Sequence, residues 1–187
     1  MAKKFFRKYV PSPESLLEKP WLRRFKPWLG HHNLWHLHRR SVAGGVAVGM
    51  FTGLFPAPLQ MISAAVLSTL LRVNLPVAVL TTLYTNPFTI VPLYILAYKI
   101  GAIVSGRGGE SLPNLQFDWN GGDIFGALPA FLEWIASLGL PLMIGVVILG
   151  CVLAPTSYFV VRGLWRLHVQ WEWRQRRRRR LLHQSVD

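Results

Sequence analysis

The sequence predicts an all-α integral membrane protein, and three observations support that prediction. Hydrophobic residues make up 51% of the 187 residues. Charged residues make up 16%, whereas soluble domains contain about 25%. Residues 42–104 include two charged side chains, Arg72 and Lys99. A stretch this long and this poor in charge is typical of helices that lie in a bilayer, and it argues against an ordinary soluble domain.

The basic residues gather at the two ends of the chain. Of 21 Lys and Arg residues, ten lie in residues 1–41, eight lie in residues 162–187 and three lie between. Cytoplasmic flanks of membrane helices carry the excess of Lys and Arg, so both termini are predicted to be cytoplasmic. Each cation at such a flank attracts anionic lipid by roughly 1 kcal/mol. The bilayer and its anionic headgroups, rather than nucleic acid, are therefore the expected partners of the run from Arg176 to Arg180.

Residues 1–41 predict a basic, aromatic segment at the cytoplasmic surface. Apolar pairs alternate with Lys and Arg, and four prolines exclude one continuous helix. Short amphipathic helices in the headgroup plane and a partly ordered tail both fit this pattern. His32 and His36 have the i, i+4 spacing of a zinc pair, but no cysteine or carboxylate nearby completes a ligand set. No metal site is predicted.

Residues 42–71 predict a re-entrant helical hairpin that is broken at Pro56 and Pro58. Residues 42–55 would extend about 21 Å as a helix, too little for a hydrocarbon core of about 30 Å. Residues 59–71 have the same shortfall. A single crossing kinked at the two prolines is the alternative, but two prolines around one alanine favour a turn.

Residues 77–104 predict the first full crossing. As a helix these 28 residues would extend about 42 Å, enough to cross despite the interruption at Asn86 and Pro87. Pro92 adds a second break, and Tyr94 and Tyr98 suit an aromatic belt near the membrane surface.

The rest of the chain predicts a loop, a surface helix, a second crossing and a tail. Residues 105–123 are polar and rich in glycine, and residues 124–138 read as an interfacial helix. Residues 140–161 carry no charge and would extend about 33 Å as a spanning helix. Residues 162–187 form an Arg/Trp-rich cytoplasmic tail. A competing topology makes 42–71 a full crossing and turns 124–161 into a hairpin; the charge rule fits both.

Gly45, Gly49 and Gly53 fall on one face of the first predicted helix. Glycines at this spacing let two helix backbones approach closely. The face predicts helix packing, either as a homodimer seam or as the tight closure of the hairpin.

Uncharged polar side chains gather around the two breaks, and Arg72 is the full charge nearest to both. Broken helices present dipole ends and free backbone groups to their surroundings. The side chains could bind a polar or anionic ligand, or they could only satisfy the backbone that the prolines free. The candidate ligand-binding residues are Gln60, Arg72, Asn74, Asn86 and Thr89.

No pattern of residues predicts catalysis or a cofactor. The chain lacks a nucleotide-binding glycine loop and an arrangement that pairs a nucleophile with its base. Two functions remain, neither of them enzymatic. The first is binding or passage of a polar, headgroup-like ligand where the two breaks meet. The second is a dimeric membrane scaffold whose basic arms dock anionic lipid or a cytoplasmic partner.

Several ordered motifs resemble the DUF2062 family of uncharacterised bacterial membrane proteins. They include residues 34–43, the pattern Gly49-x-Phe51-x-Gly53-x-Phe55-Pro56-x-Pro58-x-Gln60, residues 72–76 and residues 86–89. The resemblance implies a multi-pass protein of the proteobacterial inner membrane. It implies no activity, but its motifs coincide with the two breaks.

Overall fold

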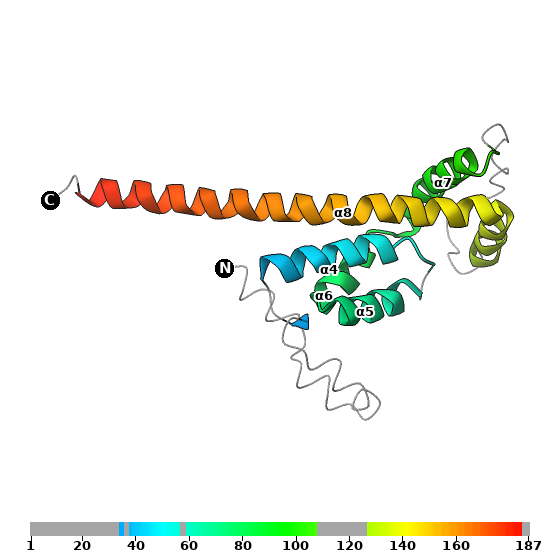
Figure 1. Cartoon of the computed structure of the whole chain (residues 1–187), viewed down its shortest axis with the longest axis horizontal. Coiled ribbons are helices and arrows are strands. Elements are labelled where there is room, and N and C mark those ends of the chain that lie inside the picture. Colours follow the sequence, from blue (N-terminus) through cyan, green and yellow to red (C-terminus); the bar gives the residue numbers. More distant parts are fainter. Residues whose placement is uncertain (1–33, 36–37, 57–58, 108–126, 185–187) are drawn as a thin grey trace, which may run out of the picture.

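The structure is all-helical over the residues it describes. In this computed structural model these are residues 34–35, 38–56, 59–107 and 127–184. Figure 1 shows shorter helices grouped beside one long helix, whose C-terminal part projects beyond them. The helices are α4 (Arg39–Thr52), α5 (Leu59–Leu71), α6 (Leu75–Thr82), α7 (Pro87–Val104) and α8 (Ala127–Gln184). Pro58 and most of the predicted segments 1–41 and 105–123 lie outside the described residues.

The chain reverses direction twice in α4, α5 and α6. At one end, Thr85 after α6 contacts both Gly53 after α4 and Gln60 in α5. At the other end, the Asn74 backbone N–H, just before α6, donates to the carbonyl of Ser41 in α4 over 3.1 Å. Hence α5 is antiparallel to α4, and α6 is parallel to α4. One kinked helix through residues 42–71 does not describe this arrangement, whereas the predicted reversal near Pro56 does.

Asparagine and proline start two helices where the sequence predicted one broken helix. α6 ends at Thr82 and α7 begins at Pro87, so the predicted crossing 77–104 consists of two helices. Asn86 is the N-cap of α7, which puts Pro87 at the first helical position. A proline there costs no hydrogen bond, because that N–H has no partner within the helix anyway. Pro92 remains inside α7.

α7 and α8 cross at a pair of glycines. A Cβ atom built on Gly101 would lie 1.8 Å from the Pro141 carbonyl oxygen, and one on Gly145 would lie 1.7 Å from the Ala97 carbonyl oxygen. The two backbones are therefore in direct contact, an approach that only glycine permits. The reversed order of the contacts makes the two helices antiparallel.

A core of apolar side chains joins α7 to the end of α4 and to α8, on both sides of Gly139 in that helix. Its fully or nearly fully buried members include Leu54, Tyr94, Tyr98, Trp134 and Leu138. Tyr94 is 1% exposed and Tyr98 is 5% exposed. The aromatic-belt prediction for these two tyrosines is therefore wrong: they fill the interior of the helix group.

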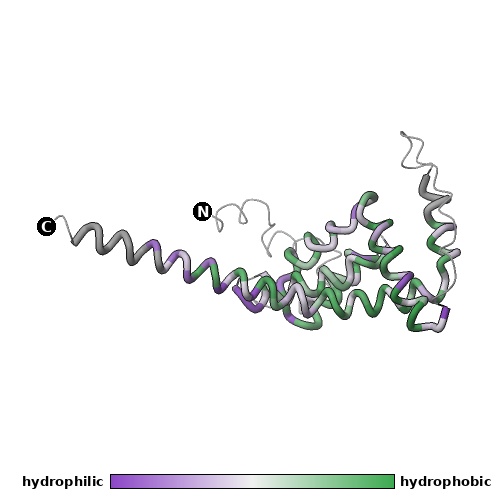
Figure 2. Tube along the Cα trace, turned by 90° about the horizontal axis from the view of Figure 1, so that it is seen from above, coloured by the Kyte–Doolittle hydropathy of each residue, from purple (hydrophilic) through white to green (hydrophobic). Residues whose placement is uncertain are grey.

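α8 is sharply bent at Gly139. That residue has φ 52° and ψ −142°, a conformation that glycine adopts without the steric cost of a Cβ. Figures 1 and 2 both show the short arm, residues 127–138, turned away from the long arm. The long arm contains the predicted crossing 140–161 and continues as helix to Gln184, through most of the predicted tail. Its colour in Figure 2 changes from apolar to hydrophilic toward the C-terminus.

Within the described residues, one helix is long and apolar enough to cross a membrane. It is the segment Leu132–Trp173 of α8, whose most apolar window has a mean hydropathy of 2.4. Only 39% of that window is buried, so most of it faces away from the other helices. α5 and the segment Phe88–Val104 are shorter apolar helices.

Candidate functional site

The two breaks meet, as the sequence-based hypothesis required, and Thr85 stands at their junction. Its Oγ1 lies 2.7 Å from the Gly53 carbonyl oxygen, 3.0 Å from Gln60 Oε1 and 2.9 Å from the Thr82 carbonyl oxygen. Thr85 is 8% exposed and Gln60 is 6% exposed. This junction therefore joins the end of α4, the start of α5 and the end of α6 through a buried hydroxyl group.

Two tyrosine hydroxyl groups also bond backbone carbonyls at the C-terminal end of α4. Tyr84 Oη donates to the Met50 carbonyl over 2.8 Å, and Tyr94 Oη donates to the Leu54 carbonyl over 2.9 Å. The last carbonyls of a helix have no partner within the helix, and leaving them unpaired in an apolar interior would be costly. Together with Thr85, the two tyrosines cap the C-terminal end of α4 from segments 32 to 40 residues further along the chain.

Asn86 and Thr89 form a capping box at the start of α7. The Asn86 side chain accepts from the backbone N–H groups of Phe88 and Thr89, at 2.9 and 3.0 Å. Thr89 Oγ1 accepts from the Asn86 N–H over 2.9 Å and lies 2.6 Å from the Tyr84 carbonyl oxygen. Both side chains are thus occupied by backbone groups, which is the repair role considered from the sequence.

Arg72 and Asn74 lie at the opposite end of α5 from Gln60. α5 has 13 residues, so about 20 Å of helix separates the two places. Asn74 is buried and accepts from the Val77 N–H over 3.0 Å as the N-cap of α6. Arg72 is exposed, with φ 54° in the turn between α5 and α6. The five candidate residues therefore do not form one site.

The glycine face of α4 packs against α6 of the same chain. Built Cβ atoms on Gly45 and Gly49 would lie 2.6 Å from the Asn74 carbonyl oxygen and 2.5 Å from the Ala78 carbonyl oxygen. One on Gly53 would lie 2.4 Å from the Tyr84 ring. Of the two interpretations of this face, closure within the chain describes the structure, although the helix it closes on is α6 rather than α5.

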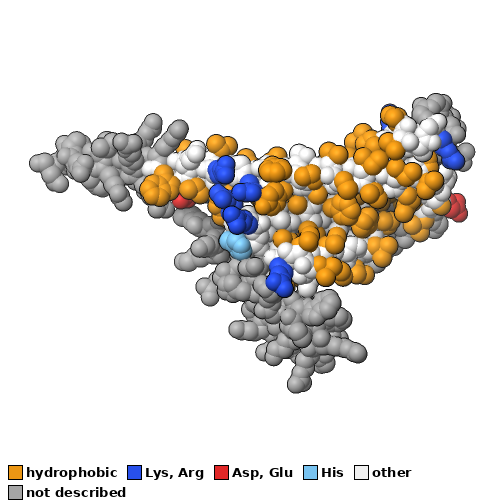
Figure 3. All heavy atoms as spheres, in the orientation of Figure 1, with side chains coloured by type: hydrophobic (Ala, Val, Ile, Leu, Met, Phe, Trp, Pro, Cys, Tyr) orange, Lys and Arg blue, Asp and Glu red, His pale blue; other side chains and the backbone are white. Residues whose placement is uncertain are grey.

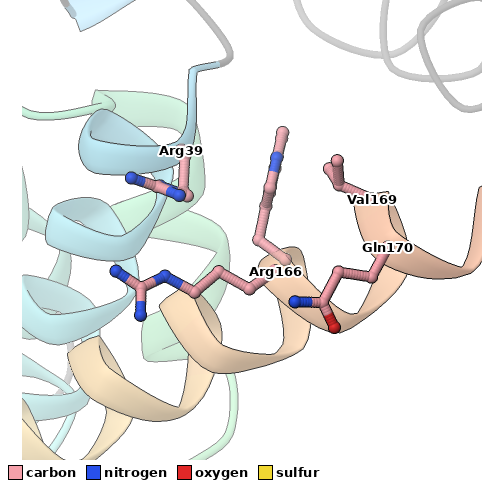
Figure 4. A pocket seen from close by; sticks show the side chains of 5 residues that line it. Arg39, Arg166, Val169 and Gln170 are labelled. Carbon is pink, nitrogen blue, oxygen red and sulfur yellow. The ribbon is translucent and has the colours of Figure 1, made fainter. Parts of the chain in front are cut away.

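A second candidate site, which sequence reasoning missed, lies between the start of α4 and the long arm of α8. An open hollow of about 540 Å³ is lined by residues of two helices. Figure 4 shows the guanidinium groups of Arg39, from α4, and Arg166, from α8, on the same side of this hollow. The remaining lining residues are Trp165, Val169 and Gln170.

The hollow has a sequence signal that is visible in retrospect. Arg39 precedes the first apolar stretch by three residues, and Arg166 follows the last one by about one helical turn. Two flanks assigned to the same side of a membrane must come near each other if their helices pack antiparallel. Among the described residues, no group of three or more His, Cys, Asp or Glu side chains is placed to hold a metal ion.

Over its described residues the chain is helical, with one helix long and apolar enough to span a membrane, an internally capped helix junction and a basic hollow. A family model described as "Uncharacterized protein conserved in bacteria (DUF2062)" matches residues 22–174. The chain belongs to this family, as its motifs indicated. Comparison with curated proteins and with solved structures gave no match.

Proposed function

We propose that this chain is a multi-pass protein of the bacterial cytoplasmic membrane that binds anionic lipid headgroups at its basic, cytoplasmic end, without covalent chemistry. The two termini lie on the cytoplasmic side. The observation that carries this proposal is the separation of charge along the helix group. Arg39, Arg72 and Arg166 lie at one end, Arg107 lies at the other, and exposed apolar side chains cover the body between them.

The basic end is assembled from three separate parts of the sequence. Arg39 and Arg166 line one hollow. Arg72 joins them because the next residue, Val73, packs against Gly44 in the first turns of α4. Figure 3 shows Lys and Arg side chains at the two ends of the visible face, with hydrophobic side chains over the area between them.

The apolar body has the length of a bilayer core. Residues 140–161 of α8 carry no charge and extend about 33 Å, close to the hydrocarbon thickness of about 30 Å. Large apolar side chains on this stretch are exposed, among them Met143 at 66% and Phe159 at 67%. A continuous surface of exposed apolar side chains is better suited to contact with lipid tails than with water.

This geometry supports the first of the two predicted topologies. α4 and α5 would enter and leave the bilayer on the cytoplasmic side, because Arg72 lies beside the start of α4. α6 and α7 would then cross outward as two consecutive helices, and the long arm of α8 would return. Non-helical backbone at membrane depth is tolerated where protein buries it, and the capped junction around Thr85 supplies that burial.

The geometry favours headgroup binding over the two narrower sequence hypotheses. At the junction, Asn86 and Thr89 bond backbone groups, so fewer of their side-chain donors and acceptors remain for a ligand. A scaffold that dimerises through Gly49 would need a face that α6 already covers. The basic end, in contrast, presents cations to the region where headgroups lie.

The test is lipid selectivity of the purified full-length protein in detergent. Native mass spectrometry would count the lipids retained from an equal mixture of phosphatidylglycerol and phosphatidylcholine. We expect preferential retention of the anionic lipid, with a preference that weakens as salt is raised. Equal retention of both lipids at low salt would contradict the proposal.

A further inference from the structure

We infer that the hollow between α4 and α8 is a binding site for the phosphate of one anionic phospholipid, held between Arg39 and Arg166. This inference rests on the proposed function and names the site at which headgroup binding is specific. The remaining cations of the basic end would attract anionic lipid only diffusely.

The two guanidinium groups supply the charge of this site. They come from different helices and lie on the same side of the hollow (Figure 4). No ion pair among the described residues involves either one; in that part of the chain His168 pairs with Glu172, at 3.4 Å. Guanidinium groups donate in a fork that matches phosphate oxygens. Two like charges on one side of a hollow, with no ion-pair partner among the described residues, are therefore expected to take up an anion.

The neighbouring groups extend the polar side of the site. Gln170 lies one turn after Arg166 on α8, and its amide adds a neutral donor beside the arginines. Arg162, one turn before Arg166, is instead placed over the Tyr158 ring, 5.4 Å from its centroid.

The apolar wall of the hollow indicates a lipid rather than free phosphate. Trp165 is 37% exposed and Val169 is 39% exposed, and both line the hollow beside the arginines. A soluble anion would gain nothing from an indole ring and an isopropyl group. A phospholipid would place its glycerol and upper acyl carbons there, at the depth that tryptophan prefers in membranes.

The test compares the full-length wild type with Arg39→Gln/Arg166→Gln in the same native mass spectrometry competition. Removing both cations should weaken retention of the first phosphatidylglycerol molecule roughly 30-fold. Arg40→Gln/Arg107→Gln removes two exposed cations outside the hollow and should weaken retention by no more than about fivefold, the diffuse effect of the one cation at the same end. Circular dichroism would check that each variant keeps its helices.

Two outcomes would overturn the inference. One is a lipid preference in wild type that the Arg39→Gln/Arg166→Gln variant keeps in full; this would leave the proposed function standing but place the binding elsewhere. The other is displacement of the bound lipid by inorganic phosphate at matched ionic strength, with Trp165→Ser leaving lipid retention unchanged. That result would assign the hollow to a soluble anion. Loss of all lipid preference in the wild type would contradict the proposed function itself.

Discussion

At the scale of single residues, a few polar side chains satisfy backbone groups at the ends of helices. The hydroxyl groups of Tyr84, Thr85 and Tyr94 cap the end of α4, while Asn74 and Asn86 cap the starts of α6 and α7. The end of α4 and the starts of α6 and α7 are thereby each matched by a side chain that bonds the backbone there. This pairing explains how an apolar chain tolerates so many helix ends.

Thr85→Val removes the hydroxyl at the junction while keeping the side-chain shape. We expect it to lower the free energy of unfolding by about 1–3 kcal/mol, because the buried Gly53 carbonyl loses a donor. Thr156→Val is the matched control: that hydroxyl bonds the Val152 carbonyl within an exposed helical turn and should change stability by about 0.5 kcal/mol or less. Denaturant titration in detergent compares them, and equal effects of the two would contradict the junction's role.

Asn86→Ala tests capping against ligand binding. Loss of the N-cap should lower the free energy of unfolding by about 0.5–2 kcal/mol. Asn86→Asp and Asn86→Ser keep a capping oxygen and should recover most of that loss. If Asn86 instead held a ligand through its amide, Asn86→Ala would leave the free energy of unfolding unchanged. Asn86→Asp would then fail to restore ligand binding.

At the scale of elements, the glycines decide which helices touch. Gly101 and Gly145 bring α7 and α8 into backbone contact, while Gly45 and Gly49 do the same for α4 and α6. Close backbones gain dispersion and Cα–H contacts, the interactions that hold helices together where lipid replaces water.

Gly145→Ala should separate α7 from α8. Its Cβ would lie 1.7 Å from the Ala97 carbonyl oxygen, so the backbone must move and the free energy of unfolding should fall by more than about 3 kcal/mol. Gly163→Ala, on the same helix with no neighbouring atom within 4 Å, should instead raise it by about 0.5–1 kcal/mol. Thermal unfolding in detergent measures both, and a neutral Gly145→Ala would contradict the crossing.

Gly49→Leu distinguishes packing within the chain from a dimer seam. Because α6 covers this face, the substitution should destabilise each molecule without changing how many molecules associate. Chemical crosslinking and native mass spectrometry would report association, and proteolysis would report destabilisation. A stable variant that changes only from dimer to monomer would restore the seam interpretation.

The sequence predicted the helical class, the reversal near Pro56 and the segment 140–161, because charge depletion and proline act locally and leave a direct pattern. It placed the start of α7 inside a longer helix, since Asn86 and Pro87 were read as a break rather than as an N-cap and first turn. It also assigned Tyr94 and Tyr98 to the membrane surface, because burial by α8 is a long-range contact. The hollow was not predicted for the same reason: it depends on a long-range contact, because its arginines are more than a hundred residues apart.

At the scale of the whole molecule, the proposed function requires one direction of insertion into the membrane. Arg39, Arg72 and Arg166 lie at one end of the helix group, and Arg107 follows α7 at the other. The proposed headgroup site requires the first end to face the cytoplasm. In that orientation, α4 and α5 would enter and leave the bilayer on the cytoplasmic side, and the long arm of α8 would return to it.

Single cysteines in a Cys151→Ser background test this orientation most directly. Arg72→Cys and Arg107→Cys place thiols at exposed positions at the two ends of the group. A membrane-impermeant maleimide is added to cells whose outer membrane has been permeabilised. We predict labelling at position 107 and none at position 72. Position 72 should be labelled only after the cytoplasmic membrane is disrupted. Labelling of both positions from outside, or of position 72 alone, would contradict the account.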